Sequence, residues 1–448
     1  MTFLGPASMS IYFPILGSLE RDLHVSPSRI TLTITIYMIA QALFPLLTAV
    51  FSDRHGRRPV FIICLTVSVG ANIGLALQST FAALMALRCL QSFGSSSLAV
   101  VGIATVTDIL NRAERSKYRI YTSSGYTLAS ILGPVTGGLL AQFLGWRSVF
   151  WFLAMFAGVM LLLVLVCLRE SCRAVVRDGS VRPQRWNRAL IDWLRPLAYL
   201  HDHPPPPEST RRPAHGKKKL RHGQGILDPI RLLGSWQTGL VVAFQAILFC
   251  GTMALFASIP LLFHRNYAFQ PWQVGLTYVP YAAGGFAARW IVCTLTARNL
   301  QRYRHRLGAD LMDHHPREFP FERARLQVIL PLVYLAGVWV AVYSWLMQRR
   351  VHVAGPIVIL FCAGNAITGA SVGLTGLLLG IHRRSPAMAL AAANLARFLC
   401  GAGAVAVIIP GIERIGMGWM GTIVTGVYLV GSGLLWVVYY QGQRWRRG

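Results

Sequence analysis

Three arginines inside long apolar segments are the residues of this sequence with the clearest chemical consequences. Arg88, Arg289 and Arg397 each lie within such a segment, and none of the 16 Asp and Glu residues lies in the middle third of one. A guanidinium is costly to bury in an apolar environment, so it normally faces a cavity, a partner or a bound ligand. The sequence therefore predicts a positive cavity that favours anionic or neutral small molecules.

Each arginine also has a structural interpretation. For Arg397, near the midpoint of its segment, an anion contact and a hydrogen bond to backbone carbonyls fit equally well. Arg289 lies toward the end of its segment, where its head group can reach the membrane surface. Five uncharged polar residues within the segments either line the same cavity or form hydrogen bonds between helices. These are Gln41, Gln91, Gln245, Asn365 and Asn394.

Residue patterns typical of enzymes and metal sites are weak here. The string Gly401-Ala-Gly403 mimics part of a dinucleotide fingerprint, but it lies inside an apolar helix with no preceding strand, so helix packing is the better interpretation. The loop histidines are too loosely spaced for a metal site, and the eight cysteines are interpreted as small apolar side chains. The histidines are His201, His203, His305, His314 and His315. No catalytic function, metal or cofactor is predicted.

The composition explains where the apolar segments come from. The chain has 448 residues, 54% hydrophobic and only 13% charged, with 43 Lys and Arg against 16 Asp and Glu. A soluble protein carries about 25% charged residues, and a nucleic-acid-binding module does not contain apolar runs of about 20 residues. The segment starting at Met1 lacks the features of a cleavable signal peptide. A protein that spans the membrane many times is the class that remains.

Twelve apolar runs are long enough to cross a bilayer as helices. They lie at about 2–19, 30–51, 60–77, 81–108, 120–143, 147–168, 235–263, 273–296, 328–347, 354–380, 387–409 and 419–440. The predicted fold class is an all-α membrane protein with twelve transmembrane helices in two six-helix halves. The halves are 1–168 and 233–440, with a basic linker at 169–232 and a tail at 441–448.

The distribution of the cations predicts the orientation. One set of alternate loops, together with the tail, holds 33 of the 43 Lys and Arg residues, and the other set holds seven. Cytoplasmic loops are enriched in Lys and Arg. Both termini and the linker are therefore predicted to be cytoplasmic, and the basic run beginning at Lys217 is assigned to a loop beside the membrane rather than to nuclear targeting.

A short charged loop joins the second and third spans. It places Asp53, Arg54, Gly56, Arg57 and Arg58 within six positions, so that a helix-end carboxylate, a turn glycine and three cations meet. Such a loop can form a charge-relay latch against neighbouring helices. It resembles the signature loop of the major facilitator superfamily.

Two further elements extend the resemblance. Arg88-Cys-Leu-Gln91 in the fourth span resembles an Arg-containing element of that superfamily, in which the arginine serves structure or proton coupling. The fifth span has Gly133, Pro134, Gly137 and Gly138 in the pattern of the antiporter element, where Pro and Gly weaken a helix and allow close packing.

The resemblance covers essentially the whole chain and points to the fungal twelve-span drug:proton antiporter branch, which includes quinidine-resistance, dityrosine and citrate exporters. It implies a monomeric plasma-membrane carrier that exports a drug or secondary metabolite by alternating access, coupled to protons. A dedicated organic-acid exporter and a non-transporting or decayed carrier are the alternatives. Relatives tend to carry an Asp after the eighth span, where this chain has Arg298 beside Asn299, so a weaker latch is expected in the second half.

Overall fold

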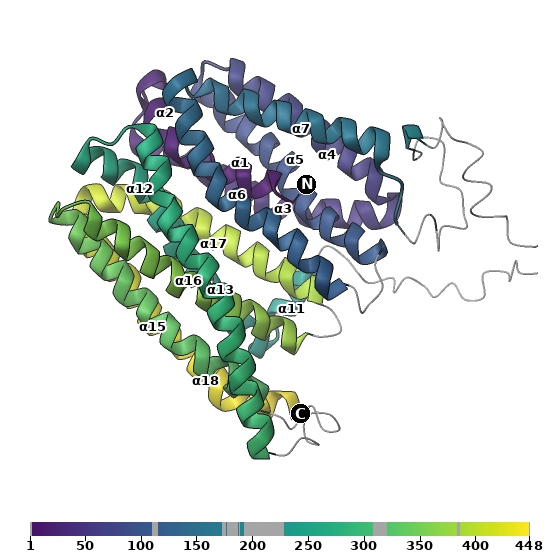
Figure 1. Ribbon diagram of the computed structural model, residues 1–448, viewed down its shortest axis with the longest axis vertical. Coiled ribbons are helices and arrows are strands. Elements are labelled where there is room, and N and C mark those ends of the chain that lie inside the picture. The colour runs from purple at the N-terminus through teal and green to yellow at the C-terminus, as the bar shows by residue number, and fades with distance from the viewer. Residues whose placement is uncertain are drawn as a thin grey trace, which may run out of the picture. The chain divides into compact units, whose positions relative to one another are not determined.

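The fold of the chain is described by a computed structural model (Figure 1). It describes residues 2–109, 115–172, 228–307, 320–382 and 386–447, together with Val176, Asn187 and 189–191. The described residues form helices and no strands. This confirms the predicted all-α class.

The first predicted span is broken rather than continuous. It consists of helix α1 (Leu4–Ser10), the 3-10 turn η1 (Phe13–Ile15) and helix α2 (Leu16–Leu23). Pro14 explains the break, because a proline ring clashes with the carbonyl of the fourth residue before it. That residue is Ser10, where α1 ends.

The other eleven predicted spans each coincide with one long helix. In the order of the chain these are α3 (Pro27–His55), α4 (Arg57–Leu77), α5 (Phe81–Ile109), α6 (Arg115–Leu144), α7 (Arg147–Cys167), α12 (Trp236–Tyr267), α13 (Pro271–Leu307), α15 (Phe321–Gln348), α16 (Ala354–Ile381), α17 (Pro386–Ile415) and α18 (Met417–Arg447). A short helix, α11 (Asp228–Leu233), precedes α12.

Nine of the described helices are long and apolar enough to cross a membrane. The other three predicted spans are the broken first one, α6 and α13. Hydropathy alone underrates α13, because Arg289, Pro280 and several Gly and Tyr residues lie within its apolar run. Helix α18 likewise continues to Arg447, so it includes all but the last residue of the predicted tail.

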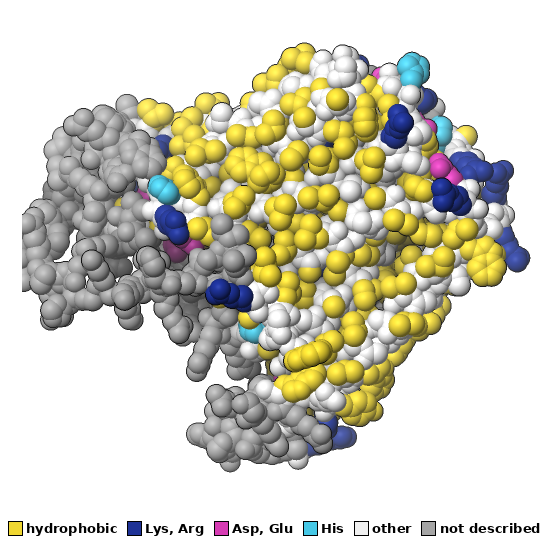
Figure 2. All heavy atoms as spheres, turned by 180° about the vertical axis from the view of Figure 1, so that it is seen from behind, with side chains coloured by type: hydrophobic (Ala, Val, Ile, Leu, Met, Phe, Trp, Pro, Cys, Tyr) yellow, Lys and Arg dark blue, Asp and Glu magenta, His cyan; other side chains and the backbone are white. Residues whose placement is uncertain are grey.

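The helices expose apolar side chains over most of their outer surface. Val430 is 82% exposed, Trp236 76% and Trp290 75%. Figure 2 shows hydrophobic side chains covering the helices on the side drawn, with Lys and Arg around the edges of this surface. Such a surface is stable only where hydrocarbon replaces water, as in a bilayer.

Small residues let neighbouring helices approach closely, as is usual in membranes. A Cβ atom on Gly94 of α5 would lie 2.6 Å from the Cys64 carbonyl oxygen and 2.7 Å from the Ser68 nitrogen, both in α4. Figure 1 shows α4 beside α7 and α15 beside α18, and these pairs are in extensive contact.

The described chain divides into two compact units. One consists of Met1–Ser10, Leu43–Gly133 and Leu144–Asp228, and the other of Ile11–Ala42, Pro134–Phe143 and Pro229–Gly448. Most of the predicted linker, including Lys217, lies outside the described residues. The division into two halves at the linker stays a prediction.

Candidate functional site

The charged loop between α3 and α4 forms a connected latch. Arg57 contacts both flanking acids: its Nη1 lies 2.6 Å from Asp53 Oδ1, and its Nε donates to Asp108 Oδ2 of α5 at 3.0 Å. Nη1 also donates to Ser52 Oγ at 3.0 Å. The Arg57 side chain is only 11% exposed. A buried cation is tolerated where carboxylates and hydrogen bonds compensate its lost hydration, so Arg57 ties the ends of α3, α4 and α5 together.

A residue outside the predicted motif completes the latch. The carboxylate of Glu170, which follows α7, accepts the backbone N–H groups of Arg57 at 2.8 Å and Arg58 at 3.1 Å. It also accepts those of Ser171 at 3.0 Å and Cys172 at 2.8 Å. Glu170 is 8% exposed. A carboxylate at a helix N-terminus satisfies donors that have no partner within the helix and interacts favourably with the helix dipole.

Glu170→Gln is expected to lower the free energy of unfolding by about 1.5–3 kcal/mol, because the N–H groups lose a charged acceptor and meet an amide N–H₂. Unfolding in mixed micelles, followed by tryptophan fluorescence, measures the change. Glu413→Gln at an exposed position of α17 is the matched control. Equal effects of the two variants would contradict the capping role.

The remaining members of the loop motif differ in environment. Arg58 is 4% exposed, and its Nη2 donates to the Leu165 carbonyl at 3.1 Å, which joins α4 to α7. Arg54 is exposed at the end of α3. Gly56 has φ +109° and ψ 163°, a conformation that is open essentially to glycine alone. The structure thus brings together Asp53, Gly56, Arg57 and Arg58.

At the corresponding place in the second half, uncharged groups make the contacts. Asn299 Nδ2 of α13 donates to the Ala324 carbonyl at 2.6 Å and to Gln327 Oε1 at 3.1 Å, both in α15. Gln327 Nε2 in turn donates to Tyr303 OH at 2.8 Å. Asn299, rather than an acid at this position, therefore fastens α13 to α15.

The glycines of the fifth-span element lie at backbone contacts. A Cβ on Gly138 of α6 would lie 2.5 Å from the Pro271 carbonyl oxygen at the start of α13. A Cβ on Gly137 would overlap the Ile11 carbonyl, and one on Gly275 of α13 the Pro134 carbonyl. The element therefore allows α6 to pack against α13 and the chain before η1 at backbone distance.

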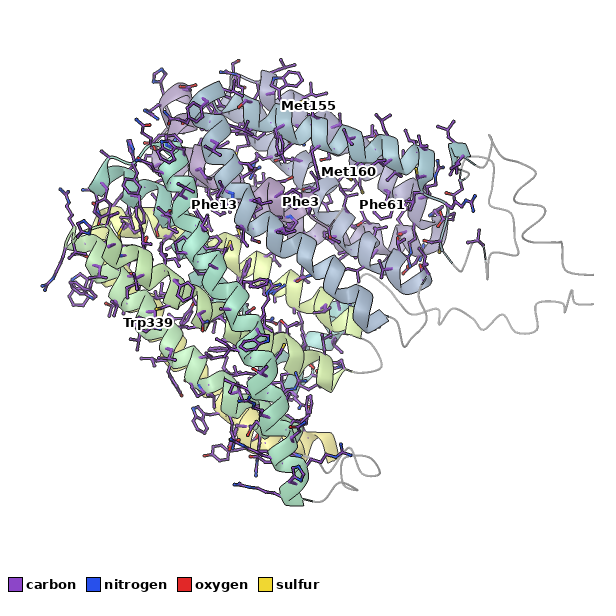
Figure 3. The ribbon with its side chains drawn as sticks, viewed as in Figure 1. Phe3, Phe13, Phe61, Met155, Met160 and Trp339 are labelled. Carbon is purple, nitrogen blue, oxygen red and sulfur yellow. The ribbon has the colours of Figure 1, made fainter. Side chains whose placement is uncertain are left out.

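An aromatic cluster accompanies this packing. Phe13 of η1, labelled in Figure 3, stacks on Tyr278 of α13 with 6.0 Å between ring centroids. It also meets Phe256 of α12 edge-on at 5.9 Å, and Phe256 lies 5.3 Å from Tyr278. Phe13 and Tyr278 are buried. Rings in this arrangement stabilise the contact of η1 with α12 and α13.

Arg88 belongs to a buried hydrogen-bond network. It is fully buried, and its Nη1 donates to Gln91 Oε1 at 2.5 Å and to the Ser8 carbonyl at 3.5 Å. Gln91 Nε2 donates to Asn72 Oδ1 at 2.7 Å, and Asn72 donates to the Ser68 carbonyl at 2.7 Å. These contacts join α1, α4 and α5 and favour the structural interpretation of Arg88 and Gln91.

Arg397 has a more open environment on α17. The side chain is half-buried, its Nη2 donates to Asn394 Oδ1, and its guanidinium carbon lies 5.7 Å from the ring centroid of Phe249 on α12. Phe249 meets Phe398 edge-on at 5.2 Å. A guanidinium over an aromatic face keeps its charge while losing part of its water. Arg397 and Asn394 therefore present a cation beside an apolar wall.

The other predicted polar residues take part in helix contacts. Gln245 Nε2 donates to Thr375 Oγ1 at 2.8 Å, which joins α12 to α16. Asn365 Nδ2 of α16 donates to the Gly284 carbonyl of α13 at 3.3 Å. Arg289 is half-buried on α13. These contacts favour interhelical hydrogen bonding for Gln245 and Asn365, and their predicted role in a cavity stays a prediction.

The residues that the structure describes contain no group of three or more His, Cys, Asp or Glu side chains arranged to hold a metal. His201, His203, His314 and His315 lie outside the described residues.

Comparison with known proteins identifies related sequences along the whole chain. The sequence pattern of the Major Facilitator Superfamily matches residues 1–405. An MFS-type transporter of a Phoma species is 37% identical over 447 residues, which cover 99% of this chain and 83% of that protein. Citrate exporter 1 of Aspergillus niger is 30% identical over 99% of this chain and 84% of its own length.

A solved structure shows the same fold. The crystal structure of the human organic anion transporter MFSD10 (TETRAN) aligns over 97% of both chains with a TM-score of 0.57 and 19% sequence identity.

Proposed function

This chain belongs to the major facilitator superfamily, and on that basis we propose that it exports a small organic anion by alternating access. In superfamily carriers, two bundles of helices rock about a site near the middle of the membrane. The membrane-spanning helices and the transporter relatives agree with a carrier.

The half-buried Arg397 is the observation that supports an anionic class of substrate. A charged side chain at the centre of a membrane helix costs about 2.5–3.5 kcal/mol on insertion scales, and such residues mark substrate or ion pathways. Arg397 donates to the Asn394 amide oxygen and lies over the Phe249 ring. A half-buried guanidinium can bind a carboxylate through charge-assisted hydrogen bonds. The name of the 30% identical citrate exporter agrees with this class of substrate.

The proposed orientation places both termini in the cytoplasm of a plasma-membrane protein. It rests on the distribution of cations along the sequence. In this orientation η1, the start of α13 and the antiporter element of α6 lie toward the outside. The contact of Phe13 with Tyr278 is then placed on the outer side of the membrane.

Proton coupling and a monomeric state belong to the proposal through the resemblance. Efflux measured with and without an imposed pH gradient tests the coupling.

Arg397→Ala is expected to reduce the uptake of citrate and benzoate into inverted vesicles by about tenfold or more, because the carboxylate loses a charge-assisted hydrogen bond. Arg414→Ala removes an exposed cation from the last turn of the same helix and is expected to leave uptake unchanged within about twofold. Unchanged uptake of both carboxylates by the Arg397 variant, together with loss of efflux of a lipophilic cation, would overturn the anionic substrate class.

A further inference from the structure

The contacts between α3 and α17 fix their relative register. Ser28 Oγ donates to Glu413 Oε2 at 3.4 Å, and Thr35 Oγ1 donates to the Ala402 carbonyl at 3.4 Å. Further along α3, the methyl carbon of Met38 lies 2.6 Å from the position that a Cβ on Gly401 would take. Residue numbers rise along α3 while they fall along α17, so the two helices run antiparallel in contact.

This register places Gln41 at the level of Arg397. Gln41 lies three residues after Met38, on the same face of α3, and Arg397 lies four residues before Gly401, on the same face of α17. Steps of three and four residues advance about 4.5 and 6 Å along their helices. Because the helices are antiparallel, both steps lead in the same direction. Gln41 and Arg397 therefore follow the Met38–Gly401 contact along one shared seam.

Gln41 brings a hydrogen-bond acceptor to this seam. Its side-chain carbonyl oxygen is buried and accepts no hydrogen bond in the part of the chain that the structure describes. A buried acceptor without a donor is destabilising. A ligand that carries a donor removes this cost when it binds, whereas a ligand without one leaves it in place.

Phe249 supplies an apolar surface beside Arg397 and Gly401. Its ring lies under the Arg397 guanidinium at 5.7 Å and within 2.9 Å of the Cβ position of Gly401. The absence of a side chain on Gly401 thus leaves the space that Phe249 and Met38 occupy. A flat apolar group can lie against this ring while its charged end reaches Arg397.

We infer that Arg397 and Gln41 recognise the two ends of one class of substrate, an organic acid that also carries a hydroxyl or N–H donor. The carboxylate binds Arg397, the donor binds Gln41 Oε1, and the body of the molecule packs on Phe249. This inference rests on the proposed export of organic anions and adds the requirement for a donor.

Binding of three radiolabelled probes to the full chain in lipid nanodiscs tests the inference. The probes are benzoate, 4-hydroxybenzoate and 4-methoxybenzoate, which share the carboxylate and the ring, but only the hydroxyl compound has a donor. The wild type is expected to bind 4-hydroxybenzoate about tenfold more tightly than the other two, the effect of one hydrogen bond to a buried acceptor. Equal binding of 4-hydroxybenzoate and 4-methoxybenzoate by the wild type would overturn the inference without any variant.

A pair of variants then assigns the preference to a residue. Gln41→Met keeps the side-chain volume. The preference for 4-hydroxybenzoate over the other two probes is expected to fall from about tenfold to about onefold, while the affinity for benzoate stays within about twofold of the wild-type value. Gln78→Met at the end of α4 changes another buried glutamine whose Oε1 accepts no hydrogen bond within the described chain, and should keep the wild-type preference. A preference retained by Gln41→Met overturns the inference and leaves the proposed function standing. A wild type that binds none of the three carboxylates overturns both.

Discussion

Gly138→Val is expected to reduce transport by about tenfold or more. The new Cβ would lie 2.5 Å from the Pro271 carbonyl oxygen and 3.0 Å from the Trp272 Cα, and both atoms belong to backbone. Backbone cannot move aside by changing a rotamer, so α6 must separate from α13. Overpacking of this kind costs about 1–3 kcal/mol. In a carrier, that cost disfavours one conformation of the transport cycle. The substitution is therefore expected to slow transport without preventing substrate binding.

Gly158→Val supplies the matched control. Gly158 is also a glycine inside a membrane helix, α7, but a Cβ there meets no heavy atom within 4 Å. Uptake into inverted vesicles is measured for both variants at equal protein abundance, together with binding of benzoate. We expect Gly138→Val to bind the probe and fail to transport it. Similar transport by the two variants would contradict a role for the close packing of α6 in the transport cycle.

Hydropathy predicted the spans well because the bilayer imposes one length and one kind of surface on every helix. The break in the first span was not predicted, although Pro14 is visible in the sequence. A proline inside an apolar run is compatible with a kink within a continuous helix as well as with the end of a helix. Pro45, Pro134 and Pro260 all lie inside continuous helices. Only the tertiary contacts decide between these outcomes, as with η1 against α13.

The latch shows where a local motif stops being informative. Five residues within six positions correctly located the turn between α3 and α4 and the charges around it. Glu170 was missed because its partners are backbone N–H groups, which every residue except proline has. One signal was present, an acid between Arg169 and Arg173 just after the sixth span. The sequence alone does not say which helix end such an acid reaches.

All three intramembrane arginines were candidates for the cavity in the sequence, and the structure places them in different environments. Arg88 is fully buried among hydrogen-bonding groups of α1 and α5, whereas Arg397 is half-buried beside Phe249. Helical periodicity does not separate these cases, because apolar residues surround both arginines on all sides. The difference arises from which face of each helix meets a neighbour. That is why we propose the anionic site on α17 rather than on α5.

The two latches use different physics for the same mechanical task. Arg57 joins α3, α4 and α5 through two carboxylates, while Asn299 joins α13 to α15 through amide and carbonyl groups. Ion pairs at a membrane surface weaken as salt increases, and neutral hydrogen bonds change little. A weaker second latch stays a prediction, and the hydrogen bonds of Asn299 predict that salt affects it less than the first.

Gly56→Ala is expected to have the largest effect on the first latch. At φ +109° and ψ 163° an alanine is strained by about 1–3 kcal/mol. Its Cβ would also overlap the Glu170 carboxylate and lie 2.9 Å from Asn187 Nδ2. The carboxylate must then move away from the N–H groups of Arg57 and Arg58, which adds about 1.5–3 kcal/mol for lost charged hydrogen bonds. The expected loss of unfolding free energy is about 3–5 kcal/mol.

Gly145→Ala separates backbone strain from the loss of the cap. Gly145 has φ +80°, but a Cβ there meets nothing within 4 Å, so only a conformational cost of about 1–2 kcal/mol is expected. Unfolding in mixed micelles gives both values. In addition, Glu170→Gln should lower the free energy of unfolding strongly in the wild-type background. In the Gly56→Ala background it should lower it very little, because Gly56→Ala has already removed the hydrogen bonds of Glu170. Additive effects of the two substitutions would show that Gly56 and Glu170 act independently, and the latch would then depend on Arg57 alone.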